Sequence, residues 1–150
     1  PQDVDSYAAR IADICYAAAR QSIEGARPVL EKIAARLPLV LVSNFYGNVE
    51  AVLKDFNLDT YFNKVIESAV VGVRKPDPQI FRLGCQALGL APEHVLVIGD
   101  SYRKDIVPAE SIGCQVLWLK GKGWTEAEDA QLHPNIIHSL GDALAFLESA

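Results

Sequence analysis

The fold follows from the stretch His94-Val95-Leu96-Val97-Ile98-Gly99-Asp100, in which an apolar run ends directly at a carboxylate. Such a run is typical of a parallel strand that is buried on both faces and opens at its carboxyl end into a polar loop. Three more apolar runs follow this pattern, at residues 39–42, 64–66 and 115–119, and helical stretches separate them, at residues 49–56, 79–88, 105–112 and 140–147. This alternation predicts an α/β protein with a doubly wound, mainly parallel sheet.

The composition is that of one globular domain. The chain has 150 residues, of which 50% are hydrophobic and 22% are charged, and its formal net charge is −5. These values exclude a disordered or collagen-like chain. The acidic balance also provides no broad attraction for nucleic acid or for an anionic membrane surface, so we expect neither as a partner.

The opening residues and the cysteines bear on the cellular compartment. No apolar run approaches the roughly 20 residues of a membrane span, and no basic region leads into an apolar stretch near the first residue. We therefore expect a cytoplasmic protein. Cys15, Cys85 and Cys114 are widely spaced in apolar patterns, which favours three core thiols over a disulfide framework or a zinc site.

The first 36 residues have helical character. Apolar and alanine positions recur at helical spacing over residues 5–20, which predicts an amphipathic helix. Gly25 and Pro28 then interrupt the pattern, so a second helix is predicted over residues 29–36, before Pro38 breaks it.

Polar residues follow the first predicted strand. A hydroxyl and an amide, Ser43 and Asn44, stand at its carboxyl end, just before a predicted helix. Such groups can offer a side-chain O–H and backbone N–H groups to a bound anion, which favours a phosphate oxygen. The alternative is that Ser43 and Asn44 only turn the chain and cap the following helix.

A lysine stands in a stiff loop between a strand and a helix. Lys75 precedes Pro76 and Pro78, which restrict the loop and can hold the ammonium group as a fixed positive charge. The alternative is an ordinary solvated lysine at the surface.

Two carboxylates follow the apolar run at residues 94–98. Asp100 stands at the strand end and Asp105 five residues later, at the start of a predicted helix. Two negative charges beside an anion site require a cation, and Mg²⁺ prefers one or two carboxylates together with phosphate and water. The alternative for Asp105 is a helix N-cap.

Taken together, these motifs resemble those of a known family. The order Ser43-Asn44, then Lys75-Pro76-Asp77-Pro78, then Gly99-Asp100-Ser101 with Asp105 resembles the second, third and fourth motifs of the haloacid dehalogenase superfamily. The likeness extends from Gly25 over nearly all of the remaining chain. It implies a Rossmann-like core of the haloacid dehalogenase type.

The resemblance also implies a chemistry and a role for each residue. Family phosphatases act on small phosphorylated metabolites through an aspartyl-phosphate, with Mg²⁺ as the cofactor. Ser43 and Asn44 would bind the transferring phosphoryl group, and Lys75 would neutralise its charge. Asp100 would ligate Mg²⁺, and Asp105 would either ligate it or hold Lys75 and the metal-bound waters.

The chain departs from the family pattern at its beginning. The first motif, an apolar strand ending in Asp-x-Asp, is expected before the other motifs. Asp3-Val4-Asp5 does not fit it, because no apolar strand precedes these residues and a helical pattern follows them. We therefore expect residues 1–24 to be a remnant of a helical cap or a linker, residues 25–150 to be the core, and this chain to be inactive on its own.

The absent first-motif strand would leave a gap in the middle of the sheet. Either the two neighbouring strands pair directly, or the opening helix covers the gap, or another chain or a preceding segment completes the sheet, because exposed strand edges are not tolerated in a buried sheet.

Three alternative functions remain open. A phosphomutase of the same family would use the same motifs. A metal-independent haloacid dehalogenase shares Ser-Asn and Lys, but Gly99-Asp100 disfavours it. A non-catalytic protein that keeps the fold for binding or assembly is favoured by the missing nucleophile.

Overall fold

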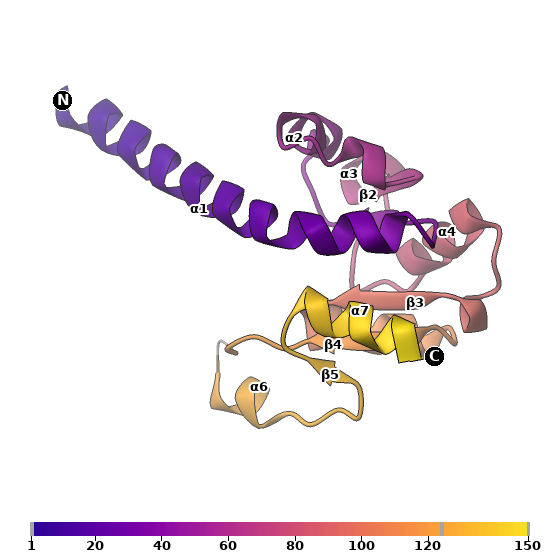
Figure 1. The fold of residues 1–150 in the computed structure, drawn as a ribbon. Helices are drawn as coiled ribbons and strands as arrows, with labels where there is room; N and C mark the ends of the chain where they lie inside the picture. Colours follow the sequence, from indigo (N-terminus) through magenta and orange to yellow (C-terminus); the bar gives the residue numbers. More distant parts are fainter. Residues whose placement is uncertain (1, 124, 150) are drawn as a thin grey trace.

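A computed structural model describes residues 2–123 and 125–149 of the chain. The α-helices are α1 (Gln2–Ala34), α2 (Val49–Asp55), α3 (Ser68–Val71), α4 (Gln79–Leu88), α5 (Val107–Ser111), α6 (Glu126–Ala130) and α7 (Leu140–Ser149). The strands are β1 (Val40–Ser43), β2 (Lys64–Glu67), β3 (Leu96–Gly99), β4 (Gln115–Leu119) and β5 (Ile136–Ile137). Strands and helices alternate from β1 onward, so the predicted α/β class is confirmed (Figure 1).

The strands form two small parallel sheets rather than the single sheet that the sequence predicts. β1 pairs with β2, with Val42 opposite Ile66, and the second sheet has the order β3-β4-β5, with Ile98 opposite Leu117. Within residues 2–123 and 125–149, β1 and β3 do not pair with each other. Of the alternatives for closing the gap, direct pairing is therefore wrong. In the part of the chain that the structure describes, β1 and β3 each have one edge without a strand neighbour.

A shared core holds the two sheets together. Ile66 of β2 packs in one cluster with Ile80 and Phe81 of α4 and with Val116 and Trp118 of β4. A second cluster joins α1 to α2, and a third joins α7 to β4 and β5. Side-chain packing through the first cluster, rather than strand pairing, connects the sheets.

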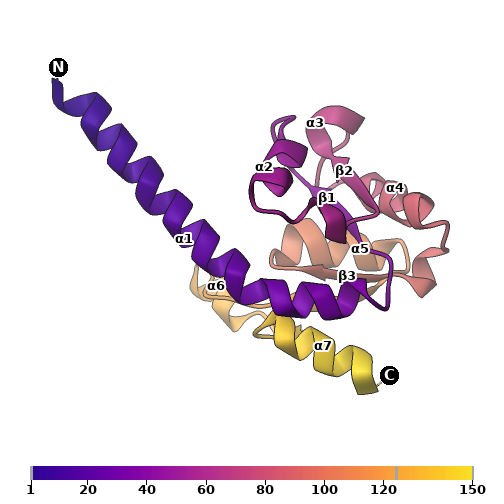
Figure 2. The ribbon, with the colours of Figure 1, turned by 45° about the horizontal axis from the view of Figure 1, so that its top comes forward.

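Helix α1 differs most from the sequence prediction. It is one continuous helix that contains Pro28, instead of two helices separated near that residue. Pro28 lacks an N–H group for the intrahelical bond. The ribbon of α1 bends in the second half of the helix, where it passes across the core (Figure 2). The packing of Ile23 and Leu30 in the second cluster sustains helical structure on both sides of the proline.

The start of α1, before Tyr16, projects away from the rest of the chain (Figures 1 and 2). Residues 3–22 are all exposed, and Ile11 and Ile14 keep 62% and 66% of their surface accessible. The opening helix therefore does not cover the gap beside β1 and β3. Cys15 is exposed as well, so the prediction of three core thiols is wrong for Cys15, whereas Cys85 and Cys114 are buried.

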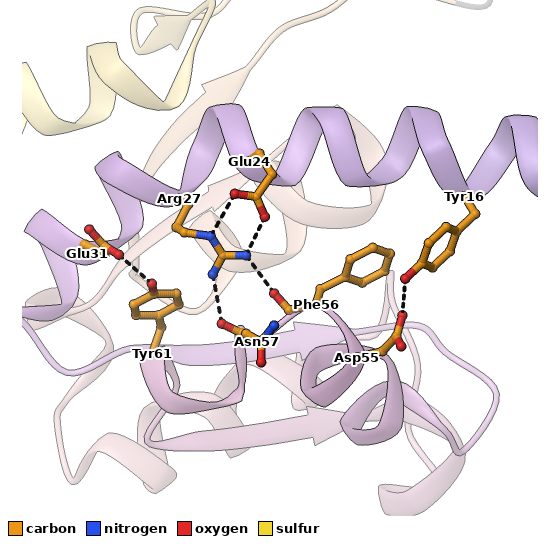
Figure 3. A network of polar contacts seen from close by, with 8 residues as sticks. All are labelled: Tyr16, Glu24, Arg27, Glu31, Asp55, Phe56, Asn57 and Tyr61. Carbon is orange, nitrogen blue, oxygen red and sulfur yellow. Dashed lines mark hydrogen bonds and ion pairs between the residues drawn. The ribbon is translucent and has the colours of Figure 1, made fainter.

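A polar network fixes α1 to the turn that follows α2 (Figure 3). The Arg27 guanidinium donates to the carbonyl oxygens of Phe56 and Asn57, at 2.8 and 2.9 Å. The hydroxyl of Tyr16 donates to Asp55 Oδ2 at 2.8 Å, and its ring stacks on Phe56. A hydrogen bond to the neighbouring Glu24 is the main reason that the pKa of Arg27 is raised. The orientation of α1 on the core is thus set by directional contacts.

No helix in the part of the chain that the structure describes combines the length and the apolar character needed to cross a membrane.

Candidate functional site

Three of the residues singled out in the sequence are connected at the carboxyl ends of the strands. Asn44 follows β1, Lys75 lies in the loop before α4, and Asp105 lies in a π-helical turn, Tyr102–Ile106, after β3. Hydrogen bonds join Asn44 to Lys75 and Lys75 to Asp105. Because β1 and β3 belong to different sheets, these contacts connect the two sheets at their carboxyl ends.

Lys75 and Asp105 form a largely buried ion pair. Lys75 Nζ lies 2.6 Å from Asp105 Oδ1, and the two side chains keep only 17% and 5% of their surface accessible. Lys75 Nζ also lies 5.9 Å from the centre of the Phe81 ring. The solvated-surface alternative for Lys75 is therefore wrong, and its ammonium is held in a fixed position, as the stiff loop predicts.

The second oxygen of Asp105 is committed as well. Asp105 Oδ2 accepts a hydrogen bond from the backbone N–H of Ser101 at 3.0 Å. The side chain of Ser101, rather than that of Asp105, caps the turn by accepting from the Lys104 N–H. Asp105 is therefore not a helix N-cap. Its carboxylate links the turn after β3 to the Lys75 loop.

Asn44 holds the backbone of Lys75. The Asn44 Oδ1 atom accepts from the Lys75 N–H at 2.8 Å, and Asn44 Nδ2 donates to the Lys75 carbonyl oxygen at 3.0 Å. This reciprocal pair takes up half of the hydrogen-bonding capacity of the amide, leaving one N–H and one lone pair of Oδ1 for other partners. The direct contribution of Asn44 to an anion site is thus smaller than its contribution to the position of Lys75.

Ser43 and Asp100 stand apart from these contacts. Ser43 is half-buried at the end of β1, and Asp100 is exposed after β3. Among the described residues, neither side chain makes a hydrogen bond or an ion pair. The backbone carbonyl of Asp100 accepts from the indole N–H of Trp118 at 2.9 Å, which fixes the chain at this point and leaves the carboxylate free.

Two residues that sequence reasoning did not select shape the loop after β1. Glu67 is buried at the end of β2 and accepts a hydrogen bond from the Gly47 N–H. Ser68 bonds both the N–H and the carbonyl oxygen of Phe45. Glu67 and Ser68 follow an apolar strand run just as Ser43 and Asp100 do, so the same signal could have identified them.

The described residues can supply Mg²⁺ with a limited set of ligands. They contain no group of three or more His, Cys, Asp or Glu side chains arranged around a metal position. Each oxygen of Asp105 already accepts one hydrogen bond, from Lys75 and from Ser101, whereas the carboxylate of Asp100 accepts none from the residues that the structure describes. Since Mg²⁺ is often bound through one or two carboxylates with phosphate and water, Asp100 fits as a single ligand but not as a complete site.

An open hollow adjoins Asn44. It is lined by residues of the loop after β1 and by residues around α3, among them Asn44, Tyr46, Ser68 and Arg74.

Asp3 and Asp5 lie in the exposed first turn of α1 rather than at the carboxyl end of a strand. Asp3-Val4-Asp5 therefore does not occupy a first-motif position.

The polar side chains gather at the carboxyl ends of the parallel strands. This is the edge at which proteins of the α/β class bind their ligands. Comparison with known proteins gives the family. The model of the haloacid dehalogenase-like hydrolases matches residues 2–113, and the chain belongs to this family of hydrolases. The resemblance inferred from the motifs is thereby confirmed.

Individual relatives are similar over most of the chain. The mouse (Mus musculus) haloacid dehalogenase-like hydrolase domain-containing protein 3 is 32% identical over 85% of this chain and 52% of its own length. Phosphoglycolate phosphatase of Escherichia coli K12 is 35% identical over 76% of this chain and 46% of its own length. A crystal structure of a phosphatase of the family from Thermococcus onnurineus has a TM-score of 0.70 and 27% identity, covering 80% of this chain and 55% of that chain. The chain thus spans about half the length of these relatives.

Proposed function

We propose that the 150 residues form the core part of a Mg²⁺-dependent phosphatase that acts on a small phosphorylated metabolite through an aspartyl-phosphate. Residues 25–150 are the core in this proposal, and residues 1–24 belong to a cap or a linker. The observation that carries it is the connected set Asn44, Lys75 and Asp105, which holds one ammonium group rigidly at the carboxyl ends of strands from both sheets.

Each residue has a role in this proposal. Lys75 neutralises the charge of the transferring phosphoryl group, Asn44 positions Lys75, and the Ser43 hydroxyl donates to a phosphoryl oxygen. Asp105 positions Lys75 rather than contacting the substrate, because its two oxygens accept hydrogen bonds from Lys75 and Ser101. Asp100 would hold Mg²⁺, which supplies further neutralisation of the phosphoryl charge when it is bound. Family membership and the phosphatase relatives support this assignment.

We further propose that this chain is inactive on its own, because no aspartate stands at the position of the attacking nucleophile. Loss of a covalent nucleophile typically lowers the rate by several orders of magnitude. The chain and a longer version that includes the first motif are to be assayed side by side with a generic aryl phosphate and Mg²⁺. We expect turnover only from the longer protein, and we expect Asp100→Asn to abolish it.

Steady Mg²⁺-dependent turnover by the 150-residue chain, lost in Asp100→Asn, would disprove the need for the absent motif. Inactivity of the longer protein toward a panel of phosphate monoesters would instead favour the second candidate, a non-catalytic binding or assembly protein. The specific observation behind that candidate is the exposed apolar face of α1, with Ile11 and Ile14 accessible.

A further inference from the structure

Two buried thiols touch in a part of the molecule that the proposed chemistry does not use. Cys85 Sγ and Cys114 Sγ lie 3.8 Å apart, although the two residues are 29 positions apart in the sequence. The residues keep only 4% and 6% of their surface accessible. Cys15, in contrast, is exposed on α1.

The thiol pair joins the two sheets at a second place. Cys85 belongs to α4, which packs against β1 and β2. Cys114 directly precedes β4, whose partners are β3 and β5. Because Cys114 stands at the amino end of its strand, the thiols lie toward the opposite edge of the sheets from the Lys75–Asp105 ion pair. Side-chain contacts therefore connect the two halves of the core near both edges.

The distance between the thiols is short enough for a covalent bond with a small adjustment. A disulfide has an S–S length of about 2.05 Å, so the sulfur atoms must approach by under about 2 Å, which rotation about the Cα–Cβ bonds and slight backbone movement can supply. We propose that Cys85 and Cys114 are a modification site, at which a two-electron oxidant of the peroxide class forms an intrachain disulfide between the two halves of the core.

The reaction is balanced as follows. The thiolate of one cysteine attacks a peroxide oxygen, which breaks the O–O bond, gives a sulfenic acid and releases one water after proton uptake. The second thiol then attacks the sulfenic sulfur, the S–S bond forms, and the hydroxyl leaves as a second water. In sum, two thiols lose two electrons and two protons, and one hydrogen peroxide becomes two waters.

Burial controls the rate of this reaction. Burial, and next the neighbouring Cys85, raise the pKa of the Cys114 thiol to about 12. The thiolate is the reactive form, so the pair is protected at neutral pH while the core is closed. Oxidation is then expected to be slow in the folded chain and faster at alkaline pH.

The test uses the intact chain with Cys15→Ser, which removes the exposed thiol and its intermolecular products. After treatment with hydrogen peroxide, we expect the intact mass to fall by two hydrogen atoms and a proteolytic digest to contain a Cys85–Cys114 cross-linked peptide. Tm should rise on the order of 5–10 °C and return after reduction with dithiothreitol, because the bond closes a loop of 29 residue positions in the unfolded chain.

Two controls separate the proposal from general oxidation. Cys85→Ala and Cys114→Ala in the same background should lose the cross-link and the Tm rise. If either variant fails to fold, the cross-linked peptide in the digest of the Cys15→Ser chain still tests the proposal. Cross-linking that occurs only in urea would overturn the proposal. So would sulfinic acid at either cysteine without any cross-linked peptide. The test is independent of the proposed phosphatase activity.

Discussion

Gly99 and Asp105 are packed so closely that a Cβ atom on Gly99 would overlap the Asp105 side chain, with its Cγ at 2.7 Å. The absence of a side chain at the end of β3 is what allows the Asp105 carboxylate to reach back to the Ser101 N–H and across to Lys75. A requirement of this kind explains in physical terms why glycine precedes Asp100.

The first prediction concerns this packing. Gly99→Ala forces Asp105 to move and should lower the free energy of unfolding by about 1–3 kcal/mol, the usual cost of overpacking. Urea unfolding followed by circular dichroism measures it. Gly25→Ala is the matched control, because a Cβ there meets nothing within 4 Å, and alanine in a helix should stabilise by up to about 1 kcal/mol. Equal effects of the two substitutions would contradict the packing argument.

The second prediction concerns the buried ion pair. Removing one partner leaves a largely buried charge, so Lys75→Ala and Asp105→Ala should each destabilise by up to about 3–5 kcal/mol. The double variant should lose much less than the sum of the two. Arg36 and Glu148 form the control pair, with 62% and 50% of their side-chain surface accessible, and their coupling should stay below about 1 kcal/mol. Additive losses at Lys75 and Asp105 would show that the ion pair is not coupled.

The third prediction concerns pH and the start of α7. The His138 backbone N–H, followed by the side chain and N–H of Ser139, lowers the pKa of Asp142 below its ordinary value. A carboxyl group with a lowered folded pKa stabilises the fold above the ordinary pKa of about 3.9, and this contribution is lost as the pH falls through the folded value. Asp142→Asn should therefore be less stable than the parent at pH 7, and the difference should shrink below about pH 4.

Thermal unfolding from pH 7 to pH 2.5 tests this prediction. Asp59→Asn is the control, because the Asp59 carboxylate, in the first turn of the 3₁₀ helix Asp59–Tyr61, accepts no hydrogen bond from the residues that the structure describes. A stability difference for Asp142→Asn that stays constant across this pH range would exclude the capping carboxylate as its source.

The fourth prediction concerns magnesium. Asp100 offers one free carboxylate, and Asp105 is held by Lys75 and Ser101. Mg²⁺ gives up its waters reluctantly and needs more than one such ligand for tight binding. Titration calorimetry should therefore detect only weak, millimolar binding. Micromolar affinity would show that another acid, such as Asp77, completes the site, and Asp77→Asn would then weaken it.

The fifth prediction concerns the unpaired edges of β1 and β3. Backbone groups that are buried without a partner cost about 1–3 kcal/mol each, and a domain is stable by only about 5–15 kcal/mol. We expect the chain to associate as its concentration rises, which static light scattering measures. Ile11→Glu on α1 separates the two possible contacts: association that persists involves the strand edges, whereas association that disappears involves α1. A strict monomer at all concentrations would contradict the argument.

Local patterns predicted most of the secondary structure. Helix α4 was predicted with its observed bounds, and four strands were predicted within two residues, because apolar runs between turn signals are strong local features. β5 was missed, since two residues carry no periodicity. The continuity of α1 through Pro28 was not predicted, because it depends on the packing of Ile23 and Leu30 and on the bonds of Arg27 to residues about 30 positions away.

The site was predicted in part. Motif order identified Lys75 and Asp105, and the structure brings them together. The commitment of the Asn44 amide to the Lys75 backbone was not predictable, because nothing in the sequence distinguishes an amide that binds a ligand from one that holds a loop. The division into two sheets was not predictable either, because pairing between strands distant in the sequence depends on the packing of the whole chain.

The long first helix also governs how the chain moves through solution. At 1.5 Å per residue its 33 residues extend for about 50 Å, whereas a compact chain of this size has a radius of gyration of only about 15 Å. A particle with such a projecting rod tumbles and diffuses more slowly than a sphere of equal mass. On a gel-filtration column the monomer should therefore elute early, at the position of a larger globular protein, and its hydrodynamic radius should shrink when residues 2–20 are removed.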